Sequence, residues 1–204
     1  MSRPRTQETL LTAITAPRTL IDAVPAPSAR VRSVVAVVGF ALLTALCAQV
    51  TFHLPWTPVP VTGQTFAVLL SGAALGAGRG AAAQFLYVAL GATGLPFYAD
   101  GTGGWSSATG STAGYLVGFV LAAAVVGRLA DRGEDRRPLT ALAAMVLGSA
   151  VIYALGAGWL AHSLGVSGAE AVELGVSPFL IGDAAKVALA GLAVPAAWQL
   201  VGRR

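Results

Sequence analysis

Six long apolar stretches constrain the fold of this chain more than any other feature. They cover residues 33–51, 63–78, 80–95, 111–130, 139–161 and 178–201. A helix needs about 20 residues to cross the hydrocarbon core of a bilayer, and the second and third stretches are the shortest of the six. We therefore expect an all-α integral membrane protein with six transmembrane helices.

The composition excludes most other classes of protein. Only 11% of the residues are charged, whereas a soluble domain carries about 25%, so a soluble enzyme or a nucleic-acid-binding protein is not expected. The 25 glycines suit helices that pack closely in lipid. The single cysteine, Cys47, lies in an apolar stretch, which excludes a disulfide framework and a cysteine metal site. No metal and no cofactor is expected.

The positions of the arginines predict the topology. Eleven of the twelve lie before the first stretch, between the second and third, between the fourth and fifth, or after the sixth, and Arg128 lies at the inner end of the fourth; the outer segments 52–62, 96–110 and 162–177 contain no Lys or Arg. Basic residues remain on the cytoplasmic side, so both termini are expected in the cytoplasm. Residues 1–32, rich in Arg and Pro, are expected to form a cytoplasmic tail, and residues 33–204 the membrane domain.

Two charged residues lie inside the sixth stretch. Lys186 is the only lysine of the chain, and Asp183 precedes it by three residues, which places both on one face of a helix. Ionisable groups within a membrane are costly and usually functional. The alternative is a pair whose charges only neutralise each other.

Further polar residues lie at a similar predicted depth on neighbouring helices: Gln64, Gln84, Tyr87 and Tyr115. Gln84 serves either the site or helix packing, because side-chain amides commonly join membrane helices. The first outer segment is rich in Pro and the second in Gly, and both are expected to fold back over the helices; the alternative is that Trp56 and Trp105 anchor them at the membrane interface. Glycines recur at four-residue spacing, which we interpret as close helix packing: Gly72, Gly76 and Gly80, then Gly114 and Gly118.

Sequence motifs give little support for catalysis. His53 and His162 belong to different outer segments, and no nucleophile–base motif is visible, so an intramembrane hydrolase is only a minor alternative. The chain also lacks the Gly-Lys-Ser/Thr ending of a phosphate-binding loop. Transport against a gradient would therefore need another subunit that hydrolyses ATP, or an ion gradient.

Several motifs occur in the order and spacing of a known family. They are Pro58-Val59-Pro60-Val61-Thr62-Gly63-Gln64-Thr65, Gln84-Phe85-Leu86-Tyr87, Gly91-Ala92-Thr93-Gly94-Leu95-Pro96, Gly114-Tyr115-Leu116-Val117-Gly118-Phe119 and Phe179-Leu180-Ile181-Gly182-Asp183-Ala184-Ala185-Lys186. Over about residues 33–190 the chain resembles the BioY family, the biotin-capturing S components of energy-coupling factor (ECF) transporters, a type of ABC transporter.

The resemblance implies a six-helix S-component bundle in the bacterial cell membrane, without enzymatic activity of its own. It also implies a biotin pocket under the outer loops and partnership with a transmembrane coupling subunit and two cytoplasmic ATPase subunits. An S component for thiamine or riboflavin is the alternative within the same class.

The resemblance also implies residue roles. The Gly-Asp-x-x-Lys motif of the family falls on Gly182, Asp183 and Lys186. Asp183 can accept from the ureido N–H groups of biotin and Lys186 can donate to its carbonyl, and the opposite orientation of biotin relative to Lys186 stays open. Further polar contacts are expected from Gln64, Tyr115 and the amides of Gly103 and Gly104, and apolar contacts from Tyr87, Phe97 and Tyr98. Two segments depart from the family pattern, Ser111–Tyr115 and Leu95–Tyr98.

A small-residue face in the first stretch has two possible roles. Ala41 and Ala45 lie one helical turn apart, and such pairs allow another helix to approach closely. In S components a similar face contacts the coupling subunit, as the resemblance implies here. Ordinary packing within the bundle is the alternative.

Overall fold

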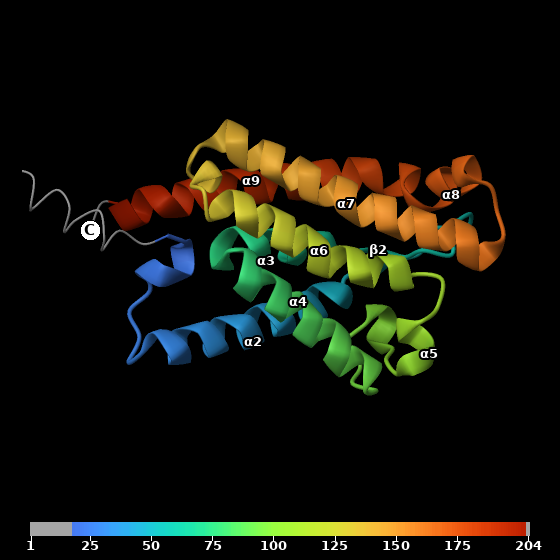
Figure 1. Ribbon diagram of the computed structural model, residues 1–204. Coiled ribbons are helices and arrows are strands. Elements are labelled where there is room, and N and C mark those ends of the chain that lie inside the picture. The colour runs from blue at the N-terminus through green and yellow to red at the C-terminus, as the bar shows by residue number, and fades with distance from the viewer. Residues whose placement is uncertain (1–17, 203–204) are drawn as a thin grey trace, which may run out of the picture.

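The computed structural model describes residues 18–202, and its regular structure is almost entirely helical (Figure 1). Each of the six apolar stretches overlaps one of the helices α2 (Ala29–Ala48), α3 (Gln64–Leu75), α4 (Ala77–Ala92), α6 (Ala113–Ala130), α7 (Pro138–Leu164) and α9 (Leu180–Gly202). The connecting segments form α5 (Trp105–Ala108), α8 (Gly168–Gly175), four 3-10 turns, η1 (Leu20–Ala23), η2 (Ala99–Gly101), η3 (Glu134–Arg136) and η4 (Ser177–Phe179), and two short strands, β1 (Thr51–Phe52) and β2 (Val61–Thr62).

The helices differ in their ability to span a bilayer. Within the described residues, four segments are long and apolar enough to cross a membrane: Ala29–Ala48, Ala113–Ala130, Pro138–Leu164 and Gly168–Val201. Helices α3 and α4 have only 12 and 16 residues. Gly76, which has a φ of 81°, separates them, because this left-handed backbone conformation cannot continue a right-handed helix. The expected count of six full spans is therefore not confirmed.

The first helix begins earlier than its apolar stretch predicts. The Ser28 side chain accepts a hydrogen bond from the Val31 N–H at 3.2 Å and caps α2, so Arg30 and Arg32 belong to its first turns. Thr19 is only 1% exposed. Where the structure describes the expected tail, from residue 18, the chain is thus part of the fold, and the boundary at residue 33 is too late. Residues 1–17 of that tail lie outside the described residues.

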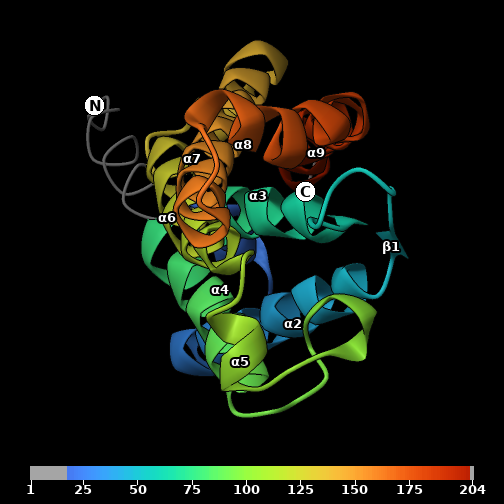
Figure 2. The same ribbon diagram turned by 90° about the vertical axis from the view of Figure 1, so that its right-hand side faces the viewer.

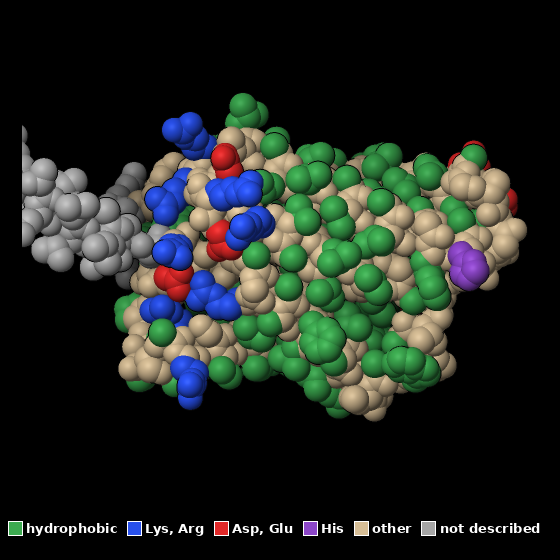
Figure 3. All heavy atoms as spheres, in the orientation of Figure 1, with side chains coloured by type: hydrophobic (Ala, Val, Ile, Leu, Met, Phe, Trp, Pro, Cys, Tyr) green, Lys and Arg blue, Asp and Glu red, His purple; other side chains and the backbone are tan. Residues whose placement is uncertain are grey.

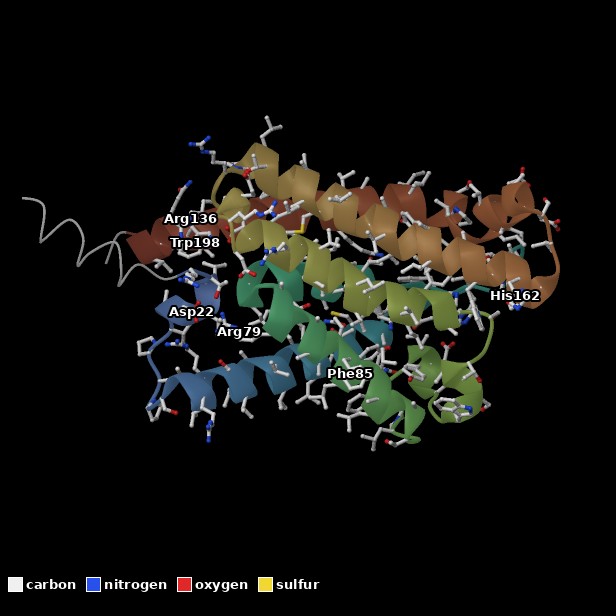
Figure 4. All side chains as sticks on the ribbon, viewed as in Figure 1. Asp22, Arg79, Phe85, Arg136, His162 and Trp198 are labelled. Carbon is white, nitrogen blue, oxygen red and sulfur yellow. The ribbon has the colours of Figure 1, made fainter. Side chains whose placement is uncertain are left out.

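A charged cluster joins the N-terminal segment to the turn between α3 and α4. Arg79 donates to both carboxylate oxygens of Asp22, at 2.8 and 3.1 Å, and to the Thr19 hydroxyl at 2.7 Å. Arg32 also contacts Asp22, at 3.3 Å. Figure 4 shows Asp22 and Arg79 together at one end of the bundle. The hydrogen bonds from Arg79 lower the pKa of Asp22 to about 2, against the opposing effect of burial.

This cluster predicts a loss of stability in acid. A carboxylate whose pKa is lowered in the folded state stabilises it above the unfolded pKa of about 3.9, and that contribution disappears as the pH falls through the folded value. We expect Asp22→Asn to lower the free energy of unfolding by about 1 kcal/mol at pH 6, because the Asp22 side chain is partly exposed. The difference from the unmodified protein should shrink as the pH falls from about 4 through 2 in thermal unfolding of detergent-purified protein, and it should be gone only below about pH 2. A difference that is as large at pH 2 as at pH 6 would contradict this assignment.

The C-terminal helix, α9, is held at the same end of the bundle as this cluster. Trp198 of α9 donates its indole N–H to Asp135 of η3, and the Arg136 guanidinium lies 4.5 Å from the Trp198 ring centre. Burial raises the pKa of Asp135. These contacts connect the end of α9 to the segment between α6 and α7 (Figure 4).

Helix α3 lies at the centre of the molecule. It packs against α2, α4, α6 and α9, and Figure 2 shows it between a group formed by α7, α8 and α9 and a group formed by α2, α4 and α5. The expected role of the glycines is confirmed at Gly114 and Gly118, where an added Cβ would collide with the α7 backbone at Leu155 and Ile152. Gly76, in contrast, serves the turn after α3.

Charge is distributed unevenly along the bundle. Figure 3 shows Lys and Arg side chains gathered at one end of the visible face and an apolar surface over its middle. The described chain begins and ends at this arginine-bearing end, and α5 and α8 lie at the other (Figure 1). Both ends of the described chain are thus on the same side, as the arginine positions predict.

Candidate ligand-binding site

A cavity of about 340 Å³ lies between the helices toward the end opposite the arginines. This volume falls in the usual range for small-molecule sites, about 300–1,000 Å³. Its walls come from α3, α4, α6, α7 and α9 and from the outer segments. The lining includes His53, Val59, Thr62, Gln64, Thr65, Tyr87, Tyr98, Asp100, Thr102, Ser107, Ser111, Tyr115, Leu116, Phe119, Ile152, Tyr153, Phe179, Asp183 and Lys186.

The predicted ion pair is present in this cavity. Lys186 Nζ lies 2.6 Å from Asp183 Oδ1 and also donates to the backbone carbonyl of Thr62 at 2.6 Å. Asp183 is only 5% exposed. Both residues lie in the first two turns of α9, so one helix face brings them to the cavity, as the three-residue spacing predicts.

Two hydroxyl groups that the sequence did not single out also hold Asp183. Thr65 of α3 donates to Oδ1 at 3.0 Å, and Tyr153 of α7 donates to Oδ2 at 2.6 Å. Thr65 lies next to Gln64 in the motif that begins at Pro58, but Tyr153 is one aromatic residue within an apolar stretch. Nothing local distinguishes it, because its contact with Asp183 depends on how α7 and α9 pack.

Gln64 and Tyr87 form a second polar pair. The Gln64 amide donates to the Tyr87 hydroxyl and accepts from the Thr62 hydroxyl, the latter at 2.7 Å. The Tyr87 ring stacks with Phe97 at a centroid distance of 6.5 Å and meets Tyr98 edge-on at 5.7 Å. Tyr87 and Tyr98 line the cavity and give it an apolar wall beside the polar groups, whereas Phe97, also expected to contact a ligand, packs on Tyr87 and is not part of the lining.

Two of the predicted tyrosines offer a ligand their rings, because their hydroxyl protons are donated to backbone carbonyls of the protein. Tyr98 donates to the backbone carbonyl of Val88 at 2.7 Å, and Tyr115 donates to that of Gly175 at 2.6 Å. Both line the cavity. The expectation that Tyr115 supplies a polar contact is therefore weakened, because its proton is already donated to α8.

The remaining hydrogen-bonding capacity describes what the cavity can bind. A carboxylate offers about four lone-pair positions and an ammonium group three N–H donors. The bonds above use three of those positions on Asp183 and two of those donors on Lys186. Among the described residues, this leaves one acceptor position on Asp183 and one N–H of Lys186 for a ligand, and Gln64, which also lines the cavity, keeps its second amide N–H. This arrangement suits a ligand with adjoining N–H and C=O groups.

The structure does not bring every predicted residue to the cavity. Gly103 and Gly104 lie in the described outer segment but do not line it. The Gly104 N–H donates to the carbonyl of Gly91 at 2.8 Å, so this amide is not available to a ligand carboxylate, and the expectation is wrong for Gly104. Thr102 and Ser107 line the cavity in the same segment.

Two other predicted positions lie in the interior. Ala41 and Ala45 are 1% and 7% exposed and belong to the apolar core, which favours packing within the bundle over contact with a partner. Gln84 is also buried, and it donates to the hydroxyls of Thr44 and Ser71 at 3.1 and 3.0 Å. Its contacts join α2, α3 and α4, so the packing interpretation applies to it.

A pair of ionisable side chains lies at the cavity mouth. His53 Nε2 is 3.0 Å from Asp100 Oδ2, and both residues line the cavity. Asp100 has a φ of 60°, which is uncommon outside glycine. The contact connects the segment between β1 and β2 with the segment that contains η2.

Comparisons with known proteins agree on one family. A family model described as the BioY family matches residues 18–203, more of the chain than the motifs cover. The chain is 37% identical over 159 residues to the biotin transporter BioY of Rhizobium etli, covering 74% of this chain and 84% of that protein. It is 40% identical over 142 residues to BioY of Thermotoga maritima, covering 68% and 80%. A crystal structure of the S component for biotin from an ECF-type ABC transporter superposes with a TM-score of 0.79 at 20% identity, covering 86% of this chain and 95% of that one. This last comparison establishes the fold.

Proposed function

The chain belongs to the BioY family, and we propose that it captures biotin and serves as the biotin-binding S component of an ECF-type transporter. It is a transport protein and not an enzyme. The observation that carries this proposal is the polar group formed by Asp183 and Lys186 on the cavity wall, where one acceptor and one donor remain for a ligand.

Biotin matches this chemistry. Its ureido ring offers two N–H donors next to one carbonyl acceptor, which complement the free acceptor position of Asp183 and the free N–H of Lys186. Hydrogen bonds in which one partner is charged are stronger than neutral ones. The thiophane ring and the valeryl chain are apolar, and the rings of Tyr87 and Tyr98 offer an apolar surface in the same cavity.

The proposal includes the partners and the location. The sequence has no phosphate-binding loop, so uptake needs an external source of energy. We propose that a transmembrane coupling subunit and two cytoplasmic ATPase subunits supply it in the bacterial cell membrane. The arginine-bearing end would then face the cytoplasm and the cavity would open outward, as expected from the positive-inside rule.

Equilibrium binding tests this function directly. Calorimetric titration of the full chain in detergent should give nanomolar affinity for biotin with one ligand per chain. The ligand should be recovered chemically unchanged after prolonged incubation. Thiamine and riboflavin, titrated under the same conditions, should release no measurable heat. Tight binding of either vitamin by a protein that ignores biotin would overturn the proposal in favour of another S component, and cleavage of a ligand would favour a hydrolase.

A further inference from the structure

Asp183 is held by groups from three helices. Its own helix, α9, contributes Lys186, α3 contributes Thr65, and α7 contributes Tyr153. Lys186 and Thr65 both contact Oδ1, whereas Tyr153 is the described residue that donates to Oδ2. The direction of the second oxygen of this carboxylate therefore depends on one hydroxyl group.

The position of Tyr153 suits this task. It lies on α7, which packs against α9, and its half-buried ring packs against the apolar core. The ring also borders a second hollow, of about 330 Å³, between α7 and α8, lined mainly by Ala, Gly and Val. Because small side chains surround this side of the ring, the 2.6 Å bond to Asp183 is its specific polar anchor.

We propose that Tyr153 is a positioning residue of the biotin site, which acts by orienting the ionised carboxylate of Asp183 toward the ligand. The hydroxyl fills one lone-pair position of Oδ2 and directs the other into the cavity. Without it, the carboxylate rotates more freely. This inference rests on the proposed function, because the ligand it concerns is biotin.

The isosteric variant Tyr153→Phe tests the inference. It removes the hydroxyl and retains the ring that separates the two hollows. Because the lost hydrogen bond has a charged partner, biotin binding should weaken about tenfold at pH 8. The matched control is Ser163→Ala on the same helix, which removes a 3.3 Å bond from a hydroxyl to the Leu160 carbonyl at a position that lines neither hollow, and it should retain the affinity of the parent.

A double-mutant cycle separates positioning from simple packing. Tyr153 and Asp183 are in direct contact, and the effects of substituting two such residues do not add when one acts through the other. We therefore expect Tyr153→Phe to weaken biotin binding about tenfold in the parent but by less than about twofold when Asp183→Asn is already present. A loss that comes only from packing would be equal in the two backgrounds.

The outcomes distinguish this inference from the proposed function. If Tyr153→Phe retains the affinity of the parent, or costs as much in the Asp183→Asn background as in the parent, Tyr153 has only a packing role and the inference is overturned. An affinity loss shared by Ser163→Ala would also overturn it, because the effect would then come from general weakening of α7. Failure of the unmodified protein to bind biotin would overturn the proposed function itself.

Discussion

Asp183→Asn is expected to weaken biotin binding roughly 10- to 100-fold, the range for loss of a hydrogen bond to a charged group. Asparagine retains the shape of the side chain but removes the charge that the ammonium group of Lys186 contacts at 2.6 Å. It also removes the charge that the hydroxyls of Thr65 and Tyr153 stabilise. Calorimetric titration of monodisperse protein measures the change in affinity.

The same substitution should also reduce stability. Removing one partner of a fully buried ion pair costs about 3–5 kcal/mol, and the expected loss here is smaller because the Lys186 side chain is 21% exposed. Lys186→Met should weaken binding in the same way. Glu173→Gln, an exposed position on α8, is the matched control for loss of a negative charge and should leave the affinity within twofold. Wild-type affinity in both folded site variants would assign the pair a purely structural role.

Gly72→Ala is expected to lower the free energy of unfolding by about 1–3 kcal/mol, the usual cost of overpacking a core. A Cβ at Gly72 would lie 2.6 Å from the backbone oxygen of Ala123 on α6 and 3.0 Å from the Val126 Cβ. Backbone atoms cannot move away as a flexible side chain can, so α3 and α6 must separate. For a chain of this size, the melting temperature should fall by about 2–4 °C per kcal/mol.

Gly39→Ala provides the control for this prediction. Gly39 also lies within a helix, α2, but an added Cβ there meets nothing within 4 Å. Alanine favours helix over glycine by about 1 kcal/mol, so this variant should melt at the same temperature as the parent or slightly higher. Equal destabilisation by the two substitutions would show that helix α3 is not in close contact with α6.

The general architecture was predictable because apolar length and arginine position are local properties of a membrane sequence. The helix ends were not, since they depend on individual contacts. Ser28 caps α2 ahead of the apolar stretch, and Gly76 ends α3 after 12 residues. Hydropathy does not identify either residue as a helix end. Serine is common at many positions, and Gly76 is only one of 25 glycines in this chain.

The site was predictable only where its residues share one helix or one motif. Asp183 and Lys186 lie three residues apart, so helical geometry alone places them together. Tyr153 lies 30 residues before Asp183, and its contact requires the relative register of two packed helices, which one sequence does not contain. The prediction for Gly104 was wrong for a related reason. Its amide N–H donates to the Gly91 carbonyl, in a turn that composition does not specify.

The length of helix α3 determines how much of the protein separates the cavity from the arginine-bearing end. Its first residue, Gln64, lines the cavity, and it ends at Leu75 beside the turn at Gly76. At 1.5 Å per residue, 12 residues span about 18 Å, compared with about 30 Å for a hydrocarbon core. The protein between the cavity and the turn at Gly76 is therefore about 18 Å deep along α3, which is little more than half the thickness of a hydrocarbon core.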